Sequence, residues 1–369
     1  MPLYFQWIFL LFFLTLPYFS FAIQDIKISV LSIFKPQELE VKIREEAPIK
    51  ITKQGNFLIY NNQKHPQLEW ESPYPITLTI PYKMQRSYEG KIILQVQNNH
   101  ILIINEIPLN SYLASVIISE MGKAPLEALK TQAVLSRTLS YQAIQKNKYK
   151  PYHLTDLTDS QAYKGFEAKT LLSKQAAQET NNLILAYKNK LAHIFYSSTC
   201  AGHTSTPHNV WGQENLGIKE VLCQKKGSFL CQKSPHFTPW QWEVSLKDLS
   251  LLDSLKNCEV KKIEIAKKSS LGRVYSLNFY SSNKKKTLLA EQFRIEVGRA
   301  FKSFGLLKSA FFTIKTSQDK VIFKGQGLGH GVGLCQWGAK ELAKQQVDFK
   351  HILQFYFPAF TLKNKEEVF

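Results

Sequence analysis

Hydrophobic and polar positions alternate in short runs over residues 23–107, which is the period expected of β-strands. The runs occupy 26–31, 39–43, 49–51, 57–60 and 76–80, and two more, 91–96 and 101–107, flank Asn98 and Asn99. Because asparagine tolerates positive φ, this pair predicts a hairpin turn. The first part of the chain is therefore predicted to be rich in β-structure.

The period changes to that of a helix between residues 106 and 143. Apolar residues recur at helical spacing over 112–117 and again over 126–134. Gly122 interrupts the pattern, and Pro125 suits the first turn of the second helix, where its missing N–H costs nothing. Two short helices joined by a tight break are expected, with Arg137 on the apolar stripe of the second.

Glu120 lies at the corner between these helices, on the last turn of the first. A negative charge there opposes the helix dipole, which raises the pKa of the carboxyl. A carboxyl that stays protonated near neutrality is what a general acid requires. The alternative from residue type alone is a solvated glutamate at a helix end.

The rest of the chain mixes both patterns. A further helix is expected over 169–180, ending at Asn181 and Asn182, because asparagine can adopt the left-handed cap. Residues 243–320 are again rich in strands and in lysine, with apolar runs at 260–265, 274–280 and 311–316. No low-complexity linker separates the parts, and the fold class predicted is α+β.

Residues 1–22 form an apolar run that ends in the small residues Ser20 and Ala22 around Phe21. This pattern is typical of a secretory signal peptide and is too short for a full membrane span. The run has no Lys or Arg at its start, so an uncleaved N-terminal anchor is the alternative. Both interpretations predict export to the periplasm or cell envelope.

The formal net charge is +18, with lysines gathered in several patches. Such a balance suits a polyanionic partner, such as cell-wall carboxylates, anionic lipid heads or nucleic acid. Nucleic acid is disfavoured by the export signal and by the absence of a binding motif for it. A solvated, lysine-rich surface without a partner is the remaining alternative.

Three cysteines and a histidine crowd one region of the sequence. Cys200, Cys223, Cys231 and His236 have the composition of a closed Cys₃His zinc site, which would be structural because four protein ligands leave no open position. A disulfide with one spare thiol and unpaired packing are equal alternatives. Cys258 and Cys335 look solitary and are expected to be buried hydrophobic residues.

A glycine-dense stretch, 323–343, has the order strand, turn and helix that invites a nucleotide-binding interpretation. No G-x-G-x-x-G or P-loop pattern fits these glycines, so that function is excluded. Glycines that alternate with a histidine instead indicate backbone packed against a groove, with His330 and Gln336 pointing into it. A tight structural turn is the alternative.

Several of these segments resemble the SpoIID/LytB family. The segment with Ser119–Glu120–Met121 resembles the family's SEM motif, and GHGVG-x-x-QWGA at 329–339 resembles its second signature. Weaker matches are SQAYKG at 160–165, the loop at 198–204, VWG at 210–212, SLGRV at 270–274 and the closing residues 352–358. The resemblance covers about 88–358; the loop after Met121 is shorter than in many relatives, and Leu271 is inserted in the S-G-R-V turn.

The resemblance implies a domain division and a chemistry. The expected parts are a signal peptide (1–22), a β-rich N-terminal region (23–87), a catalytic domain with helices around a substrate groove (88–358) and a charged C-terminal tail (359–369). The family includes a peptidoglycan lytic transglycosylase, in which the glutamate of SEM is the catalytic acid. The muramic acid's own C6 hydroxyl is then the nucleophile, so no second carboxylate and no cofactor are required.

The remaining site residues are expected to hold substrate or orient the acid: Gln132, Arg137, His330 and Gln336, with Gln161 and Tyr163 as sugar-binding side chains. Arg137 has two alternatives, an ion pair with Glu120 and a buried structural role. Gln161 and Tyr163 have a structural alternative as well. The partners implied are peptidoglycan glycan strands and an N-acetylmuramoyl-L-alanine amidase, because other family members are described as amidase enhancers. A non-catalytic enhancer and a structural envelope protein are the competing functions.

Overall fold

The computed structural model describes residues 25–157, 160–214, 216–301 and 307–369 of the 369-residue chain. The predicted signal peptide, 1–22, lies outside these residues, so export remains a prediction. The mixture of helices and sheets confirms the predicted α+β class. In the described part of the chain, no helix combines the length and apolar character that crossing a bilayer would take.

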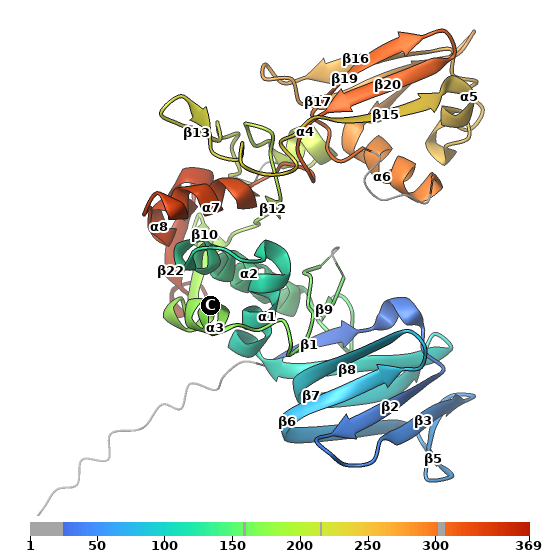
Figure 1. Cartoon of the computed structure of the whole chain (residues 1–369), viewed down its shortest axis with the longest axis vertical. Coiled ribbons are helices and arrows are strands. Elements are labelled where there is room, and N and C mark those ends of the chain that lie inside the picture. Colours follow the sequence, from blue (N-terminus) through green and yellow to red (C-terminus); the bar gives the residue numbers. More distant parts are fainter. Residues whose placement is uncertain (1–24, 158–159, 215, 302–306) are drawn as a thin grey trace, which may run out of the picture.

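A nine-stranded sheet forms the N-terminal part of the molecule (Figure 1). All neighbouring strands are antiparallel except β1 and β9, which run parallel. Asn98 and Asn99 have φ of 50° and 61°, which confirms the predicted hairpin between β7 and β8. The order across the sheet is β5 (Gln63–His65), β4 (Phe57–Tyr60), β3 (Ile49–Gln54), β2 (Glu38–Ile43), β6 (Gln67–Ile80), β7 (Met84–Gln97), β8 (His100–Pro108), β1 (Asp25–Val30) and β9 (Leu154–Thr155).

This sheet continues past the boundary that the sequence suggested at residue 87. The boundary falls inside β7, and β8 pairs with β7 from His100 to Glu106 and extends to Pro108. The hairpin turn between the two strands keeps both in one sheet, so the β-rich region ends only where the first helix begins.

The helical centre of the molecule follows directly. Helix α1 (Leu109–Met121) begins after Pro108 and ends at Gly122, whose φ is 63°. Helix α2 (Leu126–Lys146) begins after Pro125 and has most of its residues buried, because other elements surround it. Those that pack against it are α1, α3 (Leu171–Glu179), β10 (Leu183–Tyr187), α7 (Gln336–Lys344) and α8 (Phe349–Tyr356) (Figure 1).

Two small sheets join distant parts of the chain to this centre. Strand β12 (Tyr196–Ser197) pairs in parallel with β21 (Leu334–Cys335), directly before α7. Strand β10 pairs with β11 (Lys190–Leu191) and with β22 (Thr361–Asn364). The segment 359–369, expected to be a tail, therefore supplies a strand and the short helix η3 (Lys365–Glu367) to the fold.

A separate lobe follows the cysteine-rich loops in the sequence and lies apart from the helical centre, at the top of Figure 1. It has its own hydrophobic core, built around Trp242, Leu277, Phe293 and Phe323. Helix α4 (Pro207–Trp211) lies near α6 (Ala290–Ala300) of this lobe, and the hairpin of β13 (Gln224–Lys225) and β14 (Ser228–Phe229) precedes the lobe in the sequence. The lobe consists of β15 (Trp240–Ser245), α5 (Leu246–Leu249), β16 (Lys262–Lys268), β17 (Val274–Tyr280), β18 (Lys285–Leu289), α6 (Ala290–Ala300), β19 (Phe312–Ser317) and β20 (Lys320–Gly325).

Candidate active site

Glu120 lies on the last turn of α1, as predicted, and hydrogen-bond donors from three other segments face its carboxylate. Its Oε1 accepts a hydrogen bond of 2.7 Å from the backbone N–H of Ala162. The Tyr196 hydroxyl and the Gln336 side chain also hydrogen-bond to the carboxylate. As a whole residue the glutamate is partly exposed.

Burial raises the pKa of Glu120 above its ordinary value, and the three hydrogen bonds offset this only in part. Lys164 lowers the pKa least of these groups. Among the residues that the structure describes, no Lys, Arg or His lies within ion-pair distance of this carboxylate. A carboxyl that has neutral donors and no close cation keeps its pKa above the ordinary value, and such a group can both give and accept a proton.

The Ala162 N–H is held in place by the two residues on either side of it. Gln161 is fully buried, and its Nε2 donates to the Ser140 hydroxyl at 3.2 Å and to the Ser136 carbonyl at 3.3 Å. Tyr163 is 1% exposed and donates to Asn105 Oδ1 at 2.7 Å. Both side chains point into the core, so the structural alternative fits them: they anchor the donor to Glu120 and leave no surface for a sugar.

Gln132 and Gln336 form a second buried layer behind the carboxylate. Gln132 Nε2 donates to the Ser136 hydroxyl at 3.1 Å, which leaves Gln132 Oε1 to accept from Gln336 Nε2 at 3.5 Å. Gln336 is 6% exposed and is the first residue of α7. The two sequence signatures therefore meet in space, because the helix after the glycine-dense stretch brings Gln336 to Glu120.

The Tyr196 hydroxyl was not found by sequence reasoning, which placed this residue only in a strand. Strand β12 pairs Tyr196 with Leu334, two residues before Gln336, and this register brings both side chains to one carboxylate. Ser136 on α2 hydrogen-bonds to the same hydroxyl. An isolated tyrosine in a short apolar run carries no signal of this role, because the signal lies in strand pairing across more than a hundred residues.

His330 lies next to Tyr196, one of the residues around Glu120. Its Nδ1 accepts a hydrogen bond of 3.0 Å from the Val332 N–H, and it also hydrogen-bonds to the Tyr196 backbone. The ring packs against Trp211 with centroids 5.0 Å apart, and against Phe195 at 6.3 Å. Burial lowers the pKa of His330 to about 4, so the imidazole is neutral at pH 7. The structure makes His330 a neighbour of Tyr196 rather than a direct partner of the acid.

Arg137 is not part of this constellation. It is 1% exposed, and its guanidinium donates to the Ala177 carbonyl at 2.8 Å and to the Leu183 carbonyl at 3.3 Å. It also reaches Asn110 Oδ1 and Thr180 Oγ1. The interpretation as a substrate ligand is corrected here: Arg137 caps the end of α3 and ties α1 and β10 to it, as a buried structural arginine.

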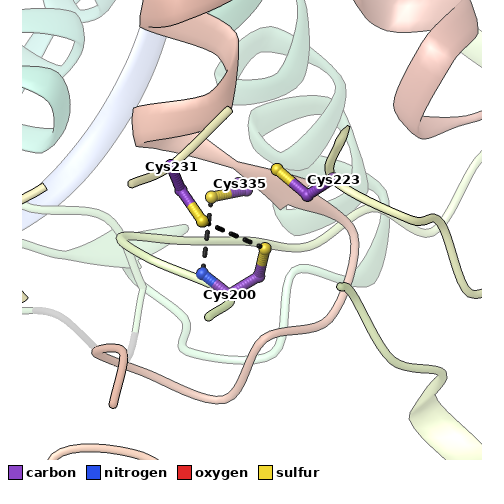
Figure 2. A group of neighbouring side chains, drawn as sticks. All are labelled: Cys200, Cys223, Cys231 and Cys335. Atoms are coloured by element: carbon purple, nitrogen blue, oxygen red, sulfur yellow. Dashed lines mark hydrogen bonds between the residues drawn. The ribbon is translucent and has the colours of Figure 1, made fainter. Parts of the chain in front are cut away.

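The cysteine prediction is corrected in two places. The sulfurs of Cys200, Cys223, Cys231 and Cys335 all lie within 4.8 Å of one another in the described part of the chain (Figure 2). Cys335 is therefore the fourth member and not a solitary core residue, because β21 delivers it to the loop after β12. His236 is outside the group; its carbonyl accepts from the Gly327 N–H at 2.7 Å.

Comparison with known proteins matches this chain to two family models and to several relatives. A family model described as stage II sporulation protein matches residues 97–187, and a second, described only as a domain of unknown function, matches 203–333. An uncharacterized protein of Brachyspira hyodysenteriae is 33% identical over 282 residues, covering 73% of this chain and 70% of that protein.

Two proteins of Bacillus subtilis carry informative names. Stage II sporulation protein D is 26% identical over 69% of this chain and 74% of its own length. The amidase enhancer is 26% identical over 68% of this chain, and the match spans only 40% of that protein. With both signatures gathered around Glu120, we conclude that the chain belongs to the SpoIID/LytB family of stage II sporulation protein D and the amidase enhancers.

Proposed function

We propose that this protein is an exported peptidoglycan lytic transglycosylase that cleaves glycan strands with Glu120 as its acid and base. The observation that carries the proposal is the environment of Glu120, whose pKa is raised by burial and which, in the described part of the chain, has neutral hydrogen-bond donors and no close cation. Among carboxylates with described surroundings, Glu127 and Asp156 instead have cations at 2.7 Å and 3.7 Å, namely Lys130 and Arg86.

The reaction needs one carboxyl group. Protonated Glu120 gives its proton to the glycosidic oxygen as the bond from that oxygen to C1 of the muramic acid breaks. The muramic acid's C6 oxygen forms the new bond to C1, and the Glu120 carboxylate accepts the proton of that C6 hydroxyl. The product is a 1,6-anhydro end, no water is consumed, the acid is regenerated, and no cofactor is required. Ordinary glycosidases, by contrast, use two carboxylates.

The hydrogen bonds around Glu120 fit its alternation between acid and base. The Tyr196 hydroxyl, the Gln336 amide and the Ala162 N–H all favour the ionised form, which exists after the proton has left. Burial favours the neutral form, which exists before. The balance between these opposing effects keeps both protonation states accessible, as a group that first donates and then accepts a proton requires.

Substrate binding is proposed for the surface beside Glu120 and Tyr196. Trp211 packs against His330 next to Tyr196, and we propose that its partly exposed ring binds a sugar. The net charge of +18 suits the carboxylates of the cell wall. We place the protein in the periplasm or cell envelope on the same grounds, together with the predicted signal peptide.

A second function is supported by one relative, which is named an amidase enhancer. In that case the same surface binds murein and recruits or stimulates an N-acetylmuramoyl-L-alanine amidase, without chemistry at Glu120. The two functions differ in what the carboxyl must do, so a substitution that changes only its proton distinguishes them.

The test compares the parent with Glu120→Gln and Glu106→Gln on glycan strands from which the stem peptides have been removed. Glu106 is a partly exposed carboxylate paired with Lys27 and serves as the matched control. Because general acid–base help is worth about 10²–10⁴-fold, Glu120→Gln is expected to form anhydro ends slower by that factor while still sedimenting with the strands.

Mass spectrometry of the released ends and an amidase assay on the same samples complete the experiment. Anhydro ends formed at the parent rate by Glu120→Gln would contradict the enzymatic function. A parent that forms none but accelerates the amidase would establish the enhancer in its place.

A further inference from the structure

Four cysteines from separate stretches of the chain meet at one buried point (Figure 2). Cys200 follows β12, Cys223 and Cys231 bracket the β13–β14 hairpin, and Cys335 ends β21. All four are fully buried. We propose that these cysteines bind one structural Zn²⁺ ion as four thiolates, and that the ion fixes Gln336 beside Glu120.

The spacing of the sulfurs fits a single tetrahedral ion. With Zn–S bonds of about 2.3 Å, the sulfurs at the corners of a tetrahedron lie about 3.8 Å apart. The Sγ atoms of Cys200 and Cys231 are 3.8 Å apart, and all four ligand atoms fall within 4.8 Å of one another. A disulfide would require one pair at about 2.05 Å and would leave the other two cysteines without a purpose in the group.

The groups that face the sulfurs are those that thiolates need. The Cys200 N–H donates to Cys335 Sγ at 3.4 Å, and the Gly202 backbone hydrogen-bonds to Cys231. The Tyr356 hydroxyl lies 3.1 Å from Cys223 Sγ and can donate to it. Hydrogen bonds to ligand atoms are a regular feature of metal sites, because they orient the ligands and spread their charge.

A buried positive charge lies against the same loop. Arg273 is fully buried and donates to the Cys200 carbonyl, and in the described chain its Nε and Nη1 find no hydrogen-bond partner. A Zn²⁺ ion with four thiolates has a net charge of −2, so the guanidinium would offset part of it. Gly331 permits this approach, because a Cβ there would come within 2.6 Å of the Arg273 guanidinium.

The position of the ion links it to two of the residues that surround Glu120. Cys335 is the residue directly before Gln336, and β21 also pairs with the strand that carries Tyr196. A bound ion therefore ties the segment with Gln336 to the segment with Tyr196, the two that supply side chains to Glu120. The site itself does not depend on the proposed function, whereas its effect on the acid does.

The experiment measures metal on the full chain before it measures activity. Protein isolated with zinc in the medium is analysed for metal content, and the apoprotein is reloaded with Co²⁺, whose thiolate charge-transfer bands and intense tetrahedral d–d bands report the ligands. Cys335→Ala removes a ligand, and Cys258→Ala is the matched control, since Cys258 is a buried cysteine in the core of the separate lobe.

We expect about one zinc per chain in the parent and in Cys258→Ala, a cobalt spectrum typical of four sulfurs, and a large drop in the unfolding temperature when a chelator removes the ion. Cys335→Ala should lose most of its zinc and its four-sulfur spectrum. The parent treated with chelator should also lose transglycosylase activity, while its binding to glycan strands stays unchanged.

Three results would overturn the zinc site: iron in place of zinc, a disulfide between any two of the four cysteines in non-reduced peptide maps, or four reactive thiols with no metal. Spectra on the parent keep the test valid even where Cys335→Ala fails to fold. A four-sulfur zinc site in a protein without transglycosylase activity would leave the site standing and refute only the proposed function.

Discussion

Burial acts against the charge of Glu120 on α1, in the helical centre, and of Glu291 on α6, in the separate lobe, yet the pKa values of the two carboxyl groups shift in opposite directions. Burial raises the pKa of Glu120. Glu291 is 3% exposed, and although burial acts against its charge, the hydrogen bond and charge of Arg294 bring its pKa below the ordinary value.

The difference lies in what faces each carboxylate. Arg294 donates to both oxygens of Glu291, at 2.8 Å and 2.6 Å. Glu120 is faced by a hydroxyl, an amide and a backbone N–H, which stabilise the carboxylate without fixing a full charge beside it. A cation makes a buried glutamate part of the framework, whereas neutral donors leave it able to exchange a proton.

The largest effect should follow from removal of the cation. Arg294→Met leaves the Glu291 charge buried and unpaired, which typically costs about 3–5 kcal/mol in the free energy of unfolding. The lowered pKa of Glu291 means that its pairing with Arg294 stabilises the folded protein fully at pH values above the pKa of Glu291 in the unfolded chain. This stabilisation is lost as the pH falls through the pKa of Glu291 in the folded protein.

The measurement is denaturant unfolding of parent and Arg294→Met at pH 7 and at a pH acid enough to protonate Glu291. Arg299→Met is the control, because this exposed arginine lies on the same helix. The deficit of Arg294→Met should shrink in acid. An equal deficit at both pH values would mean that the loss is one of packing alone and would remove one side of the comparison.

A smaller effect is expected from Tyr196→Phe, which removes one donor to Glu120 and little else. Loss of a hydrogen bond to a charged group raises the pKa of the acid further and weakens catalysis by roughly tenfold or more. The pH–rate profile on denuded strands should show its alkaline limb at higher pH than in the parent.

Tyr88→Phe is the matched control, since that tyrosine is also buried and its hydroxyl is not among the described groups that hydrogen-bond to the acid. An unchanged alkaline limb in Tyr196→Phe would show that the hydroxyl does not act on Glu120.

The smallest effect concerns stability and has the opposite sign from Arg294→Met. The pKa of Glu120 is higher in the folded protein than in the unfolded chain, so ionisation of this carboxyl destabilises the fold. This destabilisation is absent at pH values below the unfolded pKa and reaches its full size above the folded pKa. Glu120→Gln cannot ionise, so it should gain stability relative to the parent as pH rises. Thermal unfolding across pH 4–8 checks this, and a variant less stable than the parent at high pH would contradict it.

Sequence reasoning reached some of these residues and not others for identifiable reasons. Glu120 and Gln336 lie in long motifs with local signals, a helix end and a glycine-dense turn, and each was assigned to the site. Tyr196 and Cys335 depend on one parallel pairing, β12 with β21, which no local pattern announces.

The side chains that were given the wrong role share one property. Arg137, Gln161 and Tyr163 are polar residues next to the site in sequence, and in the structure all three are buried and hydrogen-bonded to the framework. Residue type indicated that they form hydrogen bonds, but whether the partner is a sugar or a backbone carbonyl depends on the direction of the side chain. That direction is set by packing against α3 for Arg137, α2 for Gln161 and β8 for Tyr163, which the sequence does not encode locally.

The most direct test of the central claim is to incubate the parent with denuded glycan strands in H₂¹⁸O and to measure the masses of the new chain ends by mass spectrometry. If Glu120 drives attack by the muramic acid's own C6 hydroxyl, the new ends lack one water relative to reducing ends and contain no ¹⁸O. New reducing ends that carry ¹⁸O would mean that water is the nucleophile, and the account of a single carboxyl acting with a substrate hydroxyl would be wrong.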